Sequence, residues 1–247
     1  MKQWRAQTLA ELRLLARNGE QLLLTIGIPV LLLVFFSVVD VLPTGEGDAI
    51  DFLLPGVLAI ALMSTAMVSL GIATGFERSY GVLKRLGATP LGRPRLIAAK
   101  VASVVSVQVF QFVVLAIIAA LLGWSASDMN IAALLIGFLF GTASFVGIGL
   151  LLAGTLRGEI NLAAQNGLYL LMLLLSGMII DADSMPAALN SLATALPSGA
   201  LATIFRTATG HSSDALAGPT MVLIAWSAAA LTLTGRNFSW SPSDSRR

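Results

Sequence analysis

Groups that could carry covalent chemistry are scarce in this chain of 247 residues. It contains no cysteine, which excludes disulfides, thiolate metal sites and cysteine nucleophiles. Its single histidine, His211, excludes a metal site built from several histidines, and we expect it to be a solvated loop residue. The phosphate-binding motif G-x-x-x-x-G-K-[ST] is also missing from the sequence. The chain is therefore expected not to be an enzyme, and not to bind ATP in the usual way.

The ionisable residues are densest in one stretch, "ERSYGVLKRLGATPLGRPRLIAAK", which holds six of the fifteen basic residues. Its apolar residues recur at helical spacing and two basic residues lie beside them: Tyr80, Leu83, Leu86, Lys84 and Arg85. This spacing predicts a short helix that begins around Ser79 and ends at Gly87, with Pro90 marking the break. A second helix is expected to begin near Arg93 and to continue into the next apolar run.

The composition predicts an integral membrane protein. The chain is 56% hydrophobic and 11% charged, with a mean hydropathy of +0.86, whereas soluble domains carry roughly a quarter of their residues as charged ones. The net charge of +2 could indicate nucleic-acid binding if the basic residues formed one soluble patch. They are instead distributed between apolar runs, so no nucleic-acid partner is expected.

Six apolar stretches are long enough to cross a bilayer core of about 30 Å: residues 21–39, 52–74, 101–123, 131–154, 160–180 and 215–235. None of them contains Asp, Glu, Lys, Arg or His. Carriers driven by protons or sodium ions generally place such groups inside the membrane, and so do intramembrane enzymes. The energy for any uphill transport must therefore come from outside the spans.

Basic residues orient these spans, since basic loops stay in the cytoplasm. Every Lys and Arg except Arg206 falls on one side, which predicts six spans with both termini cytoplasmic. Arg206 is hypothesised to pair with Asp181 or Asp183 on the other side. The whole chain, 1–247, is read as one transmembrane domain that ends in a cytoplasmic tail over residues 236–247.

Residues 1–20 have the pattern of an amphipathic helix lying in the headgroup plane. Apolar residues including Trp4 and Leu12 fall on one face, and basic residues including Arg13 and Arg17 fall on the other. The alternative is a short amphipathic leader that only helps to set the topology.

Uncharged polar side chains within the third and fifth apolar stretches have two interpretations. They are Gln108, Gln111, Asn161, Gln165, Asn166 and Tyr169. They could hydrogen-bond between helices, or they could line a transport pathway at an interface between two such chains. Gly137, Gly141 and Gly147 in the fourth stretch are expected to permit close helix packing.

The segment over residues 181–214 is too long for a turn and too apolar for an ordinary solvated loop. Pro186 suits the start of a helix, and Pro197 breaks or restarts the pattern. We expect two short helices here. They would either dip into the outer leaflet or cap the external face.

The basic stretch resembles the cytoplasmic loop of ABC-2 type transporter permeases, including those associated with drug resistance. In that family an acidic and a basic residue precede G-x-L-x-x-L-x-x-T-P-x-x-R, and a basic residue opens the next span. The matching positions are Glu77, Arg78, Gly81, Leu83, Leu86, Thr89, Pro90, Arg93 and Lys100. Lys84 departs from the pattern, because many members carry an acidic residue there. The six apolar stretches and the segments around them also fit this family.

The resemblance implies an exporter half in the cell membrane, which pairs with a second permease and with two separate ATP-binding subunits. ATP and Mg would belong to those subunits, and this chain would bind no cofactor. The short helix after the second span would be the coupling helix, which rests in a groove of the ATPase. Its coupling residues would be Glu77, Arg78, Gly81, Leu83, Lys84, Arg85, Leu86, Thr89 and Pro90. The segment with Pro186, Pro197 and Arg206 would be a re-entrant external gate.

The uncharged spans favour a hydrophobic or amphipathic cargo, such as a drug or a lipid. Family members also move polysaccharides, so a glycan permease stays an alternative. A channel or scaffold without an ATPase partner is a second one, in which the basic loop would only set the topology.

Overall fold

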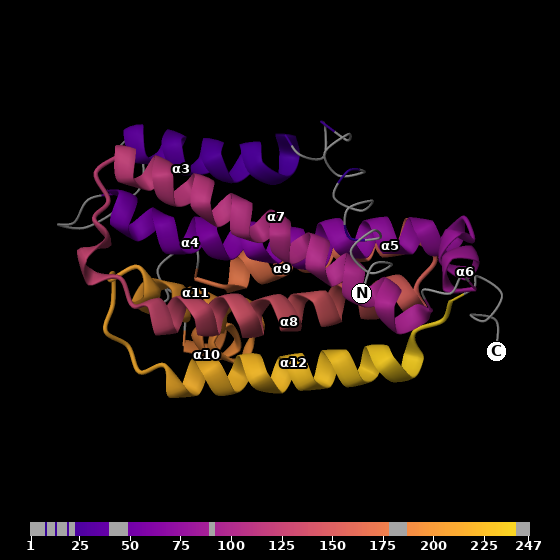
Figure 1. Cartoon of the computed structure of the whole chain (residues 1–247). Coiled ribbons are helices and arrows are strands. Elements are labelled where there is room, and N and C mark those ends of the chain that lie inside the picture. The colour runs from indigo at the N-terminus through magenta and orange to yellow at the C-terminus, as the bar shows by residue number, and fades with distance from the viewer. Residues whose placement is uncertain are drawn as a thin grey trace.

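The computed structural model describes residues 23–39, 49–88, 92–177 and 187–240, together with the isolated positions Thr8, Arg13 and Gly19. Every element in these residues is a helix, which confirms the all-α prediction (Figure 1). The interfacial helix predicted over residues 1–20 and the end of the tail from residue 241 lie outside the described residues.

A helix lies over each of the six predicted apolar stretches. In chain order the elements are η1 (Leu23–Gly27), α3 (Ile28–Val38), α4 (Ala49–Met63), η2 (Ser64–Ser69), α5 (Leu70–Ser79), α6 (Val82–Gly87), α7 (Arg93–Leu121), η3 (Ala126–Asp128), α8 (Ile131–Thr155), α9 (Gly158–Leu175), α10 (Ala187–Ala195), α11 (Pro197–Ala208) and α12 (Ala217–Asn237). η1 and η2 are π-helical turns, and η3 is a 3-10 turn. α4, η2 and α5 together form one continuous helix.

Four helices in the described residues are long and apolar enough to cross a membrane: Ala49–Ser79, Arg93–Leu121, Ile131–Thr155 and Ala217–Asn237. A fifth apolar helix, Thr25–Val38, is shorter. α9 carries three amide side chains, which lower its hydropathy. By length and composition the chain is a multi-pass membrane protein.

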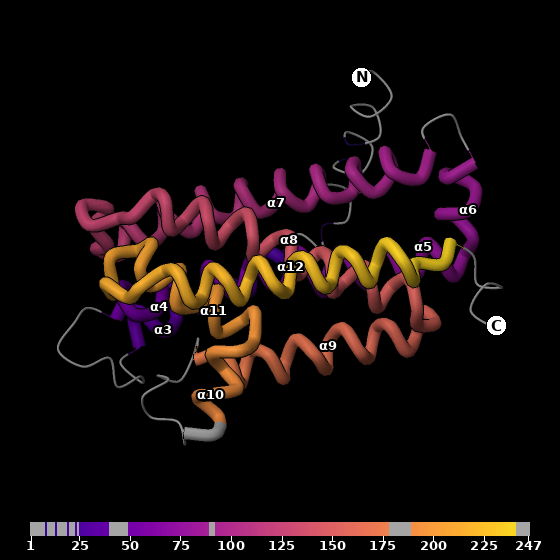
Figure 2. The backbone as a smooth tube through the Cα atoms, turned by 90° about the horizontal axis from the view of Figure 1, so that it is seen from below, coloured from indigo at the N-terminus to yellow at the C-terminus, as the bar shows by residue number. Residues whose placement is uncertain are grey.

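The long helices run side by side, with α6 at one end of the bundle and α10 and α11 in the opposite half (Figure 1). Figure 2 shows α7 and α9 on opposite sides of α8 and α12, which pack against each other. The continuous helix of α4 and α5 is central, since 83% of its most apolar stretch is buried, against 17% for α12.

The outward faces of the long helices are apolar, unlike the polar surface of a soluble bundle. Large side chains at least half exposed occur on four of these helices: Phe110, Ile117, Leu121, Leu135, Leu139, Leu170, Leu174 and Met221. A monomeric soluble protein rarely exposes apolar surface on this scale. Apolar faces of this kind are compatible with contact with lipid.

Glycines allow α8 to approach its neighbours closely, as predicted. A methyl group added at Gly137 or Gly141 would collide with side chains of α11, and one added at Gly147 would collide with Ala230 of α12. Small residues at such contacts let helices pack within a bilayer, where no hydrophobic effect drives them together. The glycines of α8 therefore fix the positions of both α11 and α12.

The short helix after the second apolar stretch ends at Gly87, as predicted, but begins at Val82 rather than near Ser79. α5 itself continues to Ser79, and the chain then turns at Gly81, whose φ of 70° lies in the left-handed region that favours glycine. The helical spacing from Tyr80 onward therefore crosses a break in the backbone. Thr89 and Pro90 lie outside the described residues.

Candidate functional site

α6 is a six-residue helix held between two glycines at one end of the bundle (Figure 1). Gly81 precedes it with φ of 70°, and Gly92 precedes α7 with φ of 73°. Both values are costly for residues with a side chain, so glycine suits the turn before α6 and the start of α7. The backbone thus presents α6 as a separate short helix at the tip of the α5 and α7 pair.

The inner face of α6 is fixed by a small apolar cluster. Leu83 and Leu96 are fully buried, and three partly buried side chains pack against them: Leu86, Phe238 and Trp240. Arg93 lies over the Trp240 ring, with its guanidinium carbon 5.0 Å from the ring centre. We define these five apolar residues as the tip cluster. It joins α6 to α7 and to the segment that follows α12.

The outer face of α6 carries exposed polar and aromatic groups. Lys84 and Arg85 are exposed, and Tyr80 is 71% exposed just before the helix. The Arg85 guanidinium donates a hydrogen bond of 3.2 Å to the Tyr80 carbonyl oxygen. This face can receive a protein surface that offers carboxylates and an apolar recess.

Exposed cations gather at the α6 end of the bundle: Lys84, Arg85, Arg93, Arg95, Arg157 and Arg236. The opposite end carries exposed carboxylates at Asp128 and Asp214. This separation of charge along the bundle is typical of membrane proteins whose basic end stays in the cytoplasm.

Glu77 and Lys100 form an ion pair between α5 and α7. The Lys100 ammonium nitrogen lies 2.7 Å from a Glu77 carboxylate oxygen, and the Lys100 side chain is 3% exposed. A lysine buried this deeply needs its partner, since an uncompensated charge there is expensive. Both residues are among the positions that match the family's loop, and an ion pair joins them across the base of the α6 hairpin.

Arg78 points into the bundle, not toward the outer face of α6. Its guanidinium donates to the carbonyl oxygens of Ala153 and Leu156 at 3.1 and 2.8 Å, and to the Ser239 hydroxyl at 2.7 Å. The last carbonyls of a helix lack partners and carry partial negative charge, so a cation there is favourable. Arg78 therefore caps the end of α8, and its side chain is 3% exposed.

Gln108 and Gln111 of α7 are buried in hydrogen bonds to neighbouring helices. The Gln108 amide donates to the Leu62 carbonyl and accepts from the Thr142 hydroxyl, at 3.2 and 3.0 Å. The Gln111 amide donates to the Thr25 carbonyl of η1 at 2.7 Å and accepts from Thr65 of η2. Both side chains fit the interhelical interpretation.

Asn161 and Gln165 of α9 occupy a recess created by two glycines of α5. The Asn161 amide donates to the Gly71 carbonyl at 3.0 Å, and the Gln165 amide donates to the Gly149 carbonyl at 2.9 Å. A methyl group at Gly71 would lie 2.0 Å from the Gln165 nitrogen, and one at Gly75 would lie 2.3 Å from that of Asn161. These two amides hold α9 against α5 and α8.

Asn166 differs from the other amides because it is exposed, and the other exposed residues of α9 from Ile160 to Leu175 are apolar. Its amide donates only to the Leu162 carbonyl of its own helix among the described contacts, at 2.9 Å. Gly167 beside it has open space around it. Tyr169 is partly buried. Of the six predicted polar residues, Asn166 alone is exposed.

α11 is inserted among the long helices and does not lie over their ends. It begins at Pro197, as predicted, and packs against α4, α8 and α12. Leu201 meets Gly141, which lies about 15 Å along α8 from its first residue at roughly 1.5 Å per residue. Trp226 of α12 donates to the Ala195 carbonyl at the turn before α11. α11 therefore lies alongside the long helices, at the level of Gly141 on α8.

Arg206 lies near the other end of α11 and donates a hydrogen bond to the Gly177 carbonyl. It therefore ties α11 to the end of α9. The predicted partners Asp181 and Asp183 lie outside the described residues, as does Pro186.

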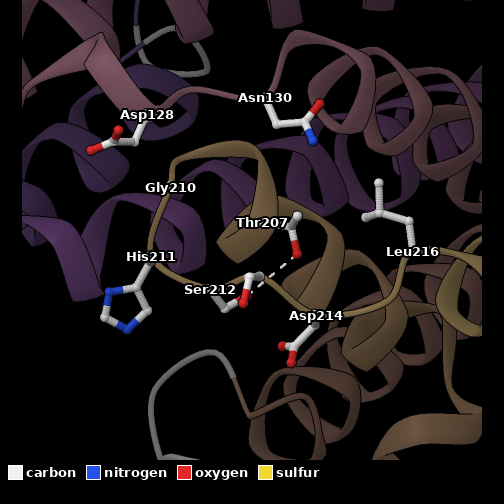
Figure 3. A pocket seen from close by; sticks show the side chains of 9 residues that line it. Asp128, Asn130, Thr207, Gly210, His211, Ser212, Asp214 and Leu216 are labelled. Atoms are coloured by element: carbon white, nitrogen blue, oxygen red, sulfur yellow. Dashed lines mark hydrogen bonds between the residues drawn. The ribbon is translucent and has the colours of Figure 1, made fainter.

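An open pocket of about 750 Å³ lies at the end of the bundle opposite α6 (Figure 3). Thr207 and Ser212 share a hydrogen bond of 3.3 Å on its wall, and Asp128 and Asp214 border it. The His211 ring points away from this hydroxyl pair, and the residue is exposed as predicted (Figure 3). Within the described residues no three His, Cys, Asp or Glu side chains are placed to hold a metal ion.

Phe238, Ser239 and Trp240 were expected only to be part of a cytoplasmic tail. In the structure the two aromatic rings pack against Leu83 and Leu96, and Ser239 forms hydrogen bonds with Arg78 and Gly154. The sequence does offer one signal, since two aromatic residues in a short polar tail are unusual for a purely solvated segment.

The sequence of the chain is similar to a known protein family. The family model described as ABC-2 type transporter matches residues 2–209, which is most of the chain. No curated protein matches it. The matched residues include α6, the glycine-bound amides of α9 and the inserted α11. By the extent of this match, the chain belongs to the ABC-2 type transporter family.

Proposed function

We propose that this chain is the permease subunit of an ABC exporter that moves a hydrophobic or amphipathic compound, such as a drug or a lipid, across the cell membrane. ATP hydrolysis would occur on two separate ATP-binding subunits, where ATP and Mg would bind. A second permease, identical or paralogous, would complete the transporter. The membrane domain of this family is a transport subunit that lacks the ATP-binding cassette.

The observation that carries the proposal is the construction of α6. A short helix at the end of two long ones, with a buried inner face and exposed Lys84 and Arg85, is suited to contact a partner from outside the membrane. The Glu77–Lys100 ion pair and the Arg78 cap stiffen its base. Because this base is stiff, a force applied to α6 would tilt α5 and α7 instead of deforming only α6 and its adjoining turns.

The proposed topology has six crossings with both termini in the cytoplasm. The crossing segments would be η1 with α3, the continuous helix of α4 and α5, and then α7, α8, α9 and α12. α11 would enter from the outer side as part of an exit gate that includes Pro186, Pro197 and Arg206. The exposed cations at the α6 end support this orientation.

The cargo class is inferred from the character of the helices. The outward faces are apolar, and the buried amides of α7 and α9 bond to backbone carbonyls. Asn166 and Tyr169 are the polar residues that we propose for the pathway at the interface with a second permease. A strongly ionic solute would find no charged group along this face of α9 between Ile160 and Leu175.

Affinity purification of the tagged chain in nanodiscs, followed by mass spectrometry and an ATPase assay, tests this function. Recovery of a stoichiometric ATP-binding subunit with ATP turnover would support the proposal. A chain that purifies repeatedly with no such subunit and no ATPase activity would contradict it and would favour a channel or scaffold. In the recovered complex, Arg85→Glu should weaken ATPase association, because it reverses a charge on the outer face of α6.

A further inference from the structure

We infer that residues 238–240, which follow α12, form a strap that holds α6 in position and links its movement to that of α8 and α12. We call them the C-terminal strap. The inference rests on the proposed coupling function of α6. The strap lies beyond residues 2–209, which are the part of the chain that the family model matches.

The strap is anchored on the end of α8. The Ser239 backbone nitrogen and hydroxyl both donate to the Gly154 carbonyl oxygen, at 3.2 and 2.8 Å. Arg78 donates to the same hydroxyl at 2.7 Å, so this hydroxyl both donates and accepts. Phe238 packs so closely on Gly154 that a methyl group there would lie 2.4 Å from its ring. Three helices, α5, α8 and α12, therefore meet at residue 239.

The far end of the strap supports α6. Trp240 packs on the buried Leu83 and Leu96, its ring lies 5.1 Å from that of Phe238, and Arg93 lies against it. A methyl group added at Gly87, the last residue of α6, would lie 3.7 Å from the Trp240 ring. Trp240 thus contacts both α6 and the start of α7.

This support matters because the backbone leaves α6 weakly constrained. α6 is six residues long and is preceded by a glycine in a left-handed conformation, and a second such glycine precedes α7. A helix of this length is not stable by itself, so its orientation depends on the side chains beneath it. Of the side chains in the tip cluster, Phe238 and Trp240 belong to the strap, and the leucines belong to α6 and α7. The strap residues are therefore positioning residues for coupling.

The test uses the complete complex in nanodiscs, two variants of the strap and one control variant at the end of α12. Trp240→Ala removes the support, Trp240→Phe keeps an aromatic ring, and Asn237→Ala is the matched control. Asn237 is exposed and donates only to the Leu233 carbonyl of its own helix among the described contacts. Each variant is also made with Leu83→Cys. Because this chain has no native cysteine, maleimide bound to this chain, separated from its partners by gel electrophoresis, reports only on that buried position.

Trp240→Ala should raise the rate of maleimide labelling at position 83 by about tenfold or more, because it opens the tip cluster. It should lower permease-dependent ATP turnover by about threefold or more while the ATP-binding subunit still co-purifies in the same ratio. Trp240→Phe should restore most of both readouts, and Asn237→Ala should change neither.

Two results would overturn the inference. One is unchanged labelling with Trp240→Ala, which would mean that the strap does not cover α6. The other is increased labelling with unchanged ATP turnover, which would mean that the strap covers α6 without positioning it for coupling. If the unaltered chain recovers no ATP-binding subunit, the proposed function and the coupling role both fail, and labelling still decides whether the strap covers α6.

Discussion

Single residues at the α6 end show that the proposed coupling motif includes residues with structural contacts. Arg78 belongs to that motif by its position, yet its guanidinium donates to two carbonyls at the end of α8 and to Ser239. Arg85, seven residues later, is exposed and bonds only to the Tyr80 and Gly81 carbonyls among the described contacts. Arg78 therefore stabilises the end of α8, whereas Arg85 lies on the outer face of α6.

Replacing Arg78 with Ala should destabilise the folded chain by about 2 to 4 kcal/mol, because several charge-assisted hydrogen bonds are lost and helix-end carbonyls stay buried. Arg85→Ala should leave stability unchanged. Unfolding in mixed detergent micelles, followed by circular dichroism, measures both variants. Equal stability of the two variants would show that Arg78 does not act as the cap of α8.

Gln165 and Asn166 are sequence neighbours that separate the two interpretations of the polar residues in the spans. Gln165→Leu should cost about 1 kcal/mol of stability, in the range measured for interhelical hydrogen bonds in bilayers. Asn166→Leu should leave stability unchanged but lower the ATP turnover of the assembled transporter, since we propose that Asn166 faces a pathway between two permeases. The same unfolding assay and an ATPase assay in nanodiscs check the pair. Unchanged turnover with Asn166→Leu would place this side chain against lipid.

At the scale of elements, the apolar stretches of the helices lack ionisable groups and pack through glycines and buried amides. Gly149 brings α8 against the backbone of η2, where an added methyl group would lie 2.7 Å from the Met67 carbonyl oxygen. A backbone atom cannot turn aside as a flexible side chain can. This contact holds the central helix to α8 at the level where Gln165 binds the Gly149 carbonyl.

Gly149→Ala should therefore destabilise the bundle by about 1 to 3 kcal/mol, as overpacking of a tight contact does. Gly167→Ala is the matched control, because it makes the same change in a helix with open space around it. That control should be neutral, or more stable by up to about 1 kcal/mol from helix propensity. Thermal unfolding of both variants in one detergent decides the comparison, and equal midpoints would contradict the backbone contact.

Hydrophobic runs and turn residues predicted an all-helical chain, and a helix lies over each of the six predicted apolar stretches. They placed α6 to within three residues at its start. They also placed Asn161, Gln165, Asn166 and Tyr169 on roughly one face of α9, but Asn161 and Gln165 are buried whereas Asn166 is exposed. They could not say which face turns inward, because α9 has apolar residues on both sides and inward and outward faces look alike in lipid. The partners of Arg78 and the packing of Trp240 depend on contacts over many residues of sequence, and no local pattern encodes those.

At the scale of the whole molecule, the two ends of the bundle differ in charge. The α6 end exposes several arginines and Lys84, while the opposite end exposes Asp128, His211 and Asp214. A cytoplasmic leaflet rich in anionic lipid attracts the first end. Because α6 lies beside the end of α12, the strap, the tip cluster and the proposed ATPase contact would share one side of the membrane.

This arrangement predicts the sidedness of two single-cysteine variants in intact cells. Ser213→Cys, at an exposed site near the opposite end, should react with a membrane-impermeant maleimide added outside. Lys84→Cys, on the exposed face of α6, should react only after the membrane is permeabilised. Because the native chain has no cysteine, neither signal has a background from the protein itself. Labelling of Lys84→Cys from outside would mean that the orientation is the reverse of the proposed one. An ATPase in the cytoplasm could then not reach α6.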